Sequence, residues 1–119
     1  QIGSDGTMAY LIEKASAELM LEPEELKEIL QAFFEDAPGL IAAGRQAVAV
    51  ADWSKLARNM HSLKGAAFNL RMEKIGALAA RAEHGDDLSA DGLAEVMQAM
   101  ELELRQTKTE IGDYFATNF

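Results

Sequence analysis

Cysteine is absent from this chain of 119 residues, and proline occurs only twice. Without cysteine, neither disulfide bonds nor thiolate metal sites can form, which fits a reducing compartment and leads us to expect a cytoplasmic protein. No apolar run approaches the roughly 18 residues that a membrane-spanning helix needs. The opening residues, QIGSDGT, also lack the charged and then apolar layout of a signal peptide.

Basic residues are scarce, because 11 Lys and Arg stand against 20 Asp and Glu and give a net charge of −9. An acidic chain repels nucleic acids and anionic membranes, so we expect neither as a partner. ATP binding is unsupported, because the sequence has neither a G-x-x-x-x-G-K-S/T loop nor a kinase-like glycine-rich loop. Arginine stands three residues before each histidine, which excludes the Glu-x-x-His pairs of a di-iron bundle.

Apolar residues recur at helical spacing along nearly the whole chain, and strand-like alternation is absent from the sequence. The predicted helices cover residues 7–19, a segment that starts at Glu22-Pro23-Glu24-Glu25, a segment capped by Asp52, residues 75–82, and a last segment from about Ala90. Asp36-Ala37-Pro38-Gly39 is expected to interrupt or kink the second of these.

This pattern predicts an all-α fold, namely an antiparallel four-helix bundle with an additional short N-terminal helix. The length suits a single domain over residues 1–119. We expect residues 1–6 to be flexible or to derive from an expression vector.

The segment NMHSLKGAAF, residues 59–68, lies on the predicted helix that follows Asp52. Six apolar residues follow one another there in steps of three and four and predict a buried stripe: Trp53, Leu56, Met60, Leu63, Ala67 and Leu70. At about 100° per residue, His61 falls roughly 135° from the centre of this stripe and is predicted to face solvent. Its neighbours on the helix surface are Arg58, Lys64, Gly65 and Phe68.

Glycine inside a helix costs about 1 kcal/mol relative to alanine, so Gly65 indicates a need for open space beside His61. Residues 52–74 carry five basic and only two acidic side chains. A positive surface around an exposed imidazole suits a nucleophile that receives a phosphoryl group. The same surface would equally suit an acidic protein partner.

The stretch D-W-x-x-L-A-R-x-x-H-S-L-K-G-A-A, which begins at Asp52, resembles the signature of histidine-containing phosphotransfer (HPt) domains. The resemblance implies that His61 accepts a phosphoryl group, that Lys64 stabilises it, and that Gly65 gives a partner close access. The candidate docking residues are Ala57, Arg58, Phe68 and Arg71.

Two of these docking positions depart from the family pattern. Arg71 stands where the family usually has a glycine, and Phe68 stands where it tends to have a small residue. Phe68 is either an apolar anchor for a partner or a side chain that folds back against a neighbouring helix. His84, near a helix end, is interpreted as a cation at the negative end of a helix dipole.

By this resemblance the chain is a phosphorelay intermediate, which takes a phosphoryl group from one receiver-domain aspartate and passes it to another. It is a carrier without ATP-dependent kinase activity of its own. The implied partners are response-regulator receiver domains, with a hybrid histidine kinase as a further candidate. We expect a monomer without an intrinsic cofactor, and a divalent metal ion in the receiver.

Two alternatives stay open on the sequence. One is a helical adaptor bundle that binds a signalling partner without chemistry. The other is a degenerate HPt-like domain that docks a receiver but does not transfer the phosphoryl group.

Overall fold

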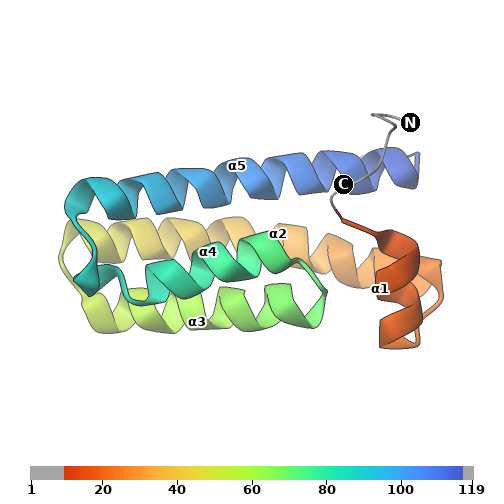
Figure 1. Cartoon of the computed structure of the whole chain (residues 1–119), viewed down its shortest axis with the longest axis horizontal. Helices are drawn as coiled ribbons and strands as arrows, with labels where there is room; N and C mark the ends of the chain where they lie inside the picture. The colour runs from red at the N-terminus through yellow and green to blue at the C-terminus, as the bar shows by residue number, and fades with distance from the viewer. Residues whose placement is uncertain (1–9, 117–119) are drawn as a thin grey trace.

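The computed structural model describes residues 10–116. The elements within this range are α1 (Ile12–Leu19), α2 (Pro23–Ala49), α3 (Trp53–Asn69), α4 (Glu73–Glu83), η1 (Gly85–Asp87) and α5 (Ala90–Tyr114). In Figure 1, α2 to α5 lie along the long axis with successive helices in opposite directions, and α1 packs across the end where α2 begins. The predicted all-α class and short N-terminal helix are confirmed. No helix of the described residues is long and apolar enough to cross a membrane.

Two of the predicted helix starts are built by local acceptor side chains. Glu22 and Glu25 form a capping box around the start of α2, with Pro23 at the first helical position. The Asp52 carboxylate accepts a hydrogen bond from the backbone N–H of Lys55 at 3.1 Å. Both predictions are confirmed, because these signals act within a few residues of the helix end.

The first helix is shorter than the predicted 7–19 and begins at Ile12. Tyr10 and Leu11 are not helical, because the Tyr10 hydroxyl is drawn to the core and donates to the Leu70 carbonyl at 2.8 Å. Leu11 is 50% exposed, although helical spacing over residues 7–19 would place it with Met8, Ile12 and Leu19 on the apolar face. The part of this prediction before Tyr10, and the six N-terminal residues expected to be flexible, lie outside the described residues.

The second helix runs without a break from Pro23 to Ala49. Of the interruption or kink predicted at residues 36–39, the interruption is therefore wrong. Pro38 lacks an N–H group for the helix ladder, but both Pro38 and Gly39 lie on the exposed side of α2. Ala37 and Ile41 are buried on either side of the proline and hold both halves of the helix against the same core. Tertiary packing therefore overrides the local signal.

The hydrophobic core lies between the long helices, and α3 contributes one continuous stripe to it. Five of the six predicted stripe residues are buried: Leu56, Met60, Leu63, Ala67 and Leu70. The sixth, Trp53, is 40% exposed, so that part of the prediction is wrong. Trp53 is the first residue of α3 and lies at the end of the bundle beside the exposed Val50.

Candidate functional site

The His61 imidazole projects from the middle of α3 with 68% of its side chain exposed, as the helical spacing predicts. Its Nδ1 lies 3.1 Å from Oε2 of Glu83 in the last turn of α4. An ionised carboxylate can only accept a hydrogen bond, so this contact assigns the ring proton to Nδ1. The lone pair of the neutral imidazole is then on Nε2, the nitrogen not bonded to Glu83.

Glu83 also binds Lys64, whose Nζ lies 2.7 Å from the second carboxylate oxygen, Oε1. The carboxylate side chain is only 16% exposed and Lys64 is 28% exposed. The hydrogen bond from Lys64 lowers the pKa of Glu83, partial burial opposes this shift, and the hydrogen bond from His61 adds to it. One carboxylate from α4 therefore orients two side chains of α3.

Glu83 was missed by the sequence reasoning, which considered α3 in isolation. The residue was visible as an acid in the last turn of the following helix, next to His84. Its position opposite His61 follows from the hairpin of α3 and α4, in which residues 61 and 83 are equally far from the turn at Met72. Because Lys64 is paired with Glu83, the predicted positive charge is partly offset beside the histidine.

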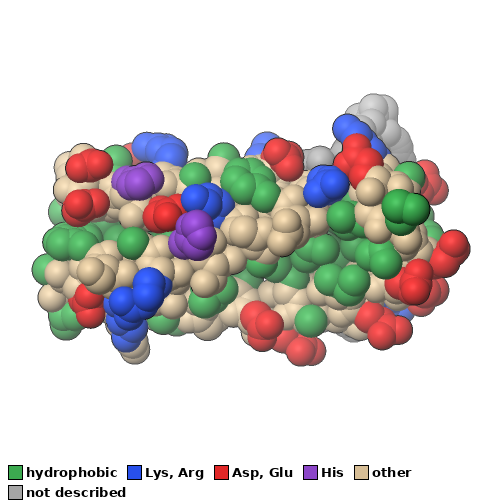
Figure 2. All heavy atoms as spheres, turned by 90° about the horizontal axis from the view of Figure 1, so that it is seen from below, with side chains coloured by type: hydrophobic (Ala, Val, Ile, Leu, Met, Phe, Trp, Pro, Cys, Tyr) green, Lys and Arg blue, Asp and Glu red, His purple; other side chains and the backbone are tan. Residues whose placement is uncertain are grey.

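The surface of α3 is open at Gly65, one turn after His61. A Cβ placed on Gly65 would meet no atom within 4 Å, so a partner can approach the backbone there. Figure 2 shows both histidine side chains on one face of the molecule, with acidic and basic side chains between them. Within residues 10–116, no three His, Asp or Glu side chains are placed to hold a metal ion.

The family model of the Hpt domain matches residues 28–111, which is more than half of the chain. The chain belongs to the Hpt domain family. Hpt domains are helical bundles of two-component phosphorelays, so the resemblance seen in the residues around His61 is confirmed at the level of the family. No curated protein and no solved structure matches the chain. The matched range begins within α2 and leaves α1 outside.

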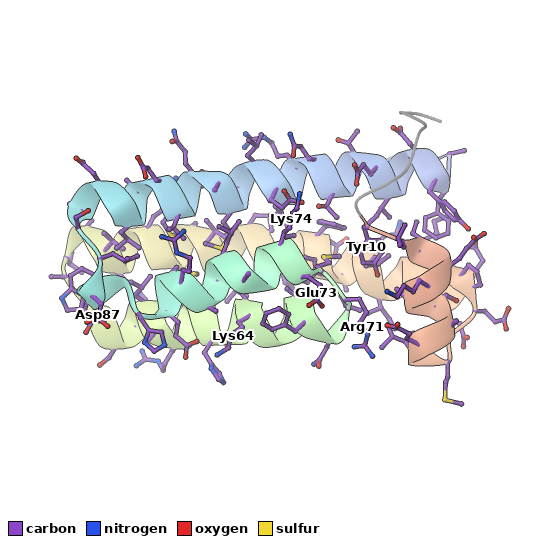
Figure 3. All side chains as sticks on the ribbon, viewed as in Figure 1. Tyr10, Lys64, Arg71, Glu73, Lys74 and Asp87 are labelled. Atoms are coloured by element: carbon purple, nitrogen blue, oxygen red, sulfur yellow. The ribbon has the colours of Figure 1, made fainter. Side chains whose placement is uncertain are left out.

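The four candidate docking residues of this Hpt domain differ in their exposure and in what they contact. Ala57 is half-buried and Arg58 is exposed, without an ion-pair partner among the described residues. Phe68 folds back against α4 and is 36% exposed, which favours the second of the two readings of this side chain. Figure 3 shows Arg71 beside α1, away from Lys64.

Arg71 has a structural role that explains how the domain tolerates the loss of a family glycine. Its φ is 66°, in the left-handed region that favours glycine. The backbone N–H groups of Arg71 and Met72 close the end of α3 on the carbonyls of Phe68 and Ala67, at 3.0 and 2.8 Å. Its Nε donates to Oε1 of Glu18 at 2.8 Å and so ties α1 to the bundle.

An apolar groove runs between α2 and α3 on the side of α3 that leads from Gly65 to the helix end. It has a volume of about 340 Å³, and its walls include Ile29, Phe33, Asp36, Leu40, Ala66 and Asn69. Among the described residues, Asp36 is the only charged one that lines it. Ile29 is 43% exposed, because it faces this groove rather than the core.

Proposed function

We propose that His61 carries a phosphoryl group between aspartates of response-regulator receiver domains. One observation supports this most directly: the exposed imidazole has its Nδ1 held by Glu83 at 3.1 Å, which leaves the Nε2 lone pair on the open side. Membership of the Hpt domain family supports the same assignment.

In the forward step, Nε2 of His61 attacks the phosphorus of an aspartyl phosphate on the donor receiver. The N–P bond forms as the bond between phosphorus and the aspartate oxygen breaks, and the carboxylate leaves with the electron pair. The proton stays on Nδ1, where the Glu83 carboxylate compensates the positive charge that the ring gains. In the return step a second receiver's aspartate attacks the phosphorus, and the electron pair of the N–P bond returns to Nε2.

Lys64 stabilises the added phosphoryl group in this proposal. The Lys64 ammonium is a compact charge with three N–H donors on a flexible side chain, so it can donate to Glu83 and to a phosphoryl oxygen on His61 at the same time. It is 28% exposed, and exposed or half-exposed ion pairs contribute about 1 kcal/mol or less. The divalent metal ion that phosphoryl transfer uses is assigned to the receiver side of the complex.

The receiver is expected to dock over His61 and Gly65 and to extend into the groove between α2 and α3. The groove is lined mostly by apolar side chains and carries the Asp36 carboxylate, so a complementary receiver presents an apolar helix face with a lysine or arginine opposite that carboxylate. Arg58 lies on the other side of His61 and meets an acidic part of the partner. Gly65→Gln would fill the open space and should slow transfer from the receiver.

The test of the proposal uses receiver domains from the same organism, phosphorylated on aspartate with acetyl phosphate. The wild-type protein should acquire an acid-labile, base-stable label on His61, and His61→Gln should abolish it while the helical circular dichroism spectrum stays unchanged. His84→Gln is the matched control, because His84 is the second exposed histidine and follows Glu83 directly. Label on His84, or label in His61→Gln, would show that the site is wrongly assigned. Receiver binding without any label would support the adaptor alternative.

Two charge substitutions separate chemistry from docking. Lys64→Ala should lower the maximal transfer rate by up to about fivefold, because one ion pair to the phosphoryl group is lost. Arg58→Ala should instead raise the receiver concentration needed for half-maximal rate, and this effect should shrink at high salt. Measuring transfer against receiver concentration at two ionic strengths distinguishes the two. A Lys64→Ala protein that transfers at the wild-type rate would remove the lysine from the mechanism.

A further inference from the structure

The Phe68 ring lies directly on the backbone of Gly76, across the interface of α3 and α4. A Cβ built on Gly76 would come within 2.5 to 2.8 Å of three ring atoms of Phe68, closer than real side chains approach. Gly76 is buried inside α4 and has a helical backbone, so its glycine is required for space and not for a special φ. Alanine has the higher helix propensity, so glycine at position 76 is explained by the space that the ring occupies.

This contact belongs to the same pair of helix faces as the site around His61. On α3, His61, Lys64 and Phe68 are separated by three and four residues and share a face, and on α4 Gly76 and Glu83 are seven residues apart and share another. The two helices run in opposite directions (Figure 1), so Phe68 meets Gly76 while His61 and Lys64 meet Glu83. The ring and the Lys64–Glu83 ion pair are therefore two contacts of the same interface between α3 and α4.

We propose that Phe68, seated on Gly76, is a positioning residue for the phosphoryl-accepting site. Side chains at helix contacts set the distance between helix axes. A ring against a glycine fixes how closely α4 approaches α3, and Glu83 then reaches both His61 Nδ1 and Lys64 Nζ from one carboxylate. This inference concerns how His61 is oriented, and its kinetic part rests on the function proposed above.

The same geometry argues against Phe68 as a free anchor for a partner. The ring is partly exposed, but three of its atoms pack on Gly76, so it is held by α4 rather than projecting freely from the surface. Rotating the ring toward a partner would uncover the backbone of α4 and leave an unfilled space in a packed interface. Loss of the ring should therefore change the chemistry of His61 even when no receiver is present.

The experiment uses the whole protein and phosphoramidate, a small donor that phosphorylates imidazole with release of ammonia and needs no docking. Phe68→Ala and Gly76→Ala should each slow labelling of His61 by about twofold to fivefold, the effect of one weakened half-exposed ion pair. Gly39→Ala is the matched control, because a Cβ on Gly39 in α2 meets no atom within 4 Å and it should label as the wild type does.

A second readout does not depend on phosphorylation. The proton–nitrogen NMR spectrum of the His61 ring reports whether its proton is on Nδ1, and both substitutions should reduce the Nδ1–H tautomer that Glu83 selects. In the double variant Phe68→Ala/Gly76→Ala, the labelling rate and the ring tautomer should differ from the wild type by less than the sum of the two single effects, because the new methyl group enters the space that the ring has left. Phe68→Leu keeps an apolar side chain on Gly76, so its labelling rate and its fraction of Nδ1–H tautomer should lie between those of the wild type and Phe68→Ala.

The outcomes separate this inference from the proposed function. If the wild type labels and both variants keep its rate and its tautomer, Phe68 is not a positioning residue. If the variants differ only in the receiver concentration they need, Phe68 is a docking residue and the inference fails. If phosphoramidate and receivers both leave the wild type unlabelled, the proposed function fails, and the ring tautomer alone still decides whether Phe68 positions His61.

Discussion

Replacing Ala51 by glycine should stabilise the fold by about 0.5–1 kcal/mol. Ala51 follows α2 with φ at 56°, a left-handed conformation that costs an L-residue about 1–2 kcal/mol. Glycine removes this strain, but it loses more backbone conformational entropy on folding than alanine does, which lowers the free energy of unfolding by about 0.5–1 kcal/mol. The side chain is exposed, and the helix-end hydrogen bonds of Ala51 and Asp52 to Val48 and Ala47 use only backbone atoms, so the substitution keeps them.

Arg71→Gly is the informative partner of this variant, because it relieves the same strain at φ 66° but also removes an ion pair. The Arg71 and Glu18 side chains are both 41% exposed, and such a pair contributes about 0.2–1 kcal/mol. The net gain should therefore be smaller than for Ala51→Gly, about 0–0.5 kcal/mol. High salt screens the pair, so the two gains should converge as ionic strength rises.

Urea unfolding followed by circular dichroism measures both values, and a gain of 1 kcal/mol corresponds to about 4 °C in Tm for a domain of this size. Ala42→Gly is the matched control, because Ala42 is exposed inside α2 and glycine there should destabilise by about 1 kcal/mol. Opposite signs at residues 42 and 51 are the expected result. A loss of stability in Ala51→Gly would refute the conformational reasoning for both helix ends.

Three further variants test single features of the fold. Tyr10→Phe should destabilise by about 1 kcal/mol at pH 7, because the Leu70 carbonyl loses its donor. Burial raises the pKa of Tyr10 to about 12. The stability that the neutral Tyr10 hydroxyl contributes is therefore complete below pH 10 and is lost as the pH rises toward 12. Between these pH values the free energy of unfolding should fall less in Tyr10→Phe than in the wild type. Pro38→Ala should raise the free energy of unfolding by about 1–3 kcal/mol, because it restores an N–H inside α2. The pKa of Glu83 is lowered from its ordinary value of 4.5, so the ionised carboxylate stabilises the fold above that pH and this stabilisation is lost on acidification. The free energy of unfolding in urea should therefore fall less between pH 7 and pH 3 in Glu83→Gln than in the wild type.

The helices could be predicted from the sequence because their signals act over a few residues. The caps at Glu22 and Asp52 and the apolar spacing of α3 and α5 are such local signals, and the structure follows them. The failures occur where a distant contact decides the outcome. Tyr10 leaves the helix for the Leu70 carbonyl, and α2 passes through Pro38 because the core holds both of its halves.

The candidate site divides in the same way. The exposure of His61 and the open space at Gly65 follow from the geometry of one helix and were predicted. Glu83 was not predicted, because its contact with His61 depends on how two helices pair. The roles of His61, Lys64 and Gly65 in phosphoryl transfer stay predictions until labelling tests them.

The two departures from the family pattern both hold the C-terminal half of α3 in place. Phe68 fastens this segment to α4 through Gly76, and Arg71 fastens it to α1 through Glu18. A side chain committed to such a contact is poorly placed to select a partner, because a substitution that alters recognition would also disturb the packing. Selection of the receiver should therefore depend on side chains without such a structural contact. Within residues 10–116, Arg58 on α3 and Asp36 in the groove between α2 and α3 have no ion-pair partner. Exchanging the charge at either residue should change which receivers are served while the rate with phosphoramidate stays the same.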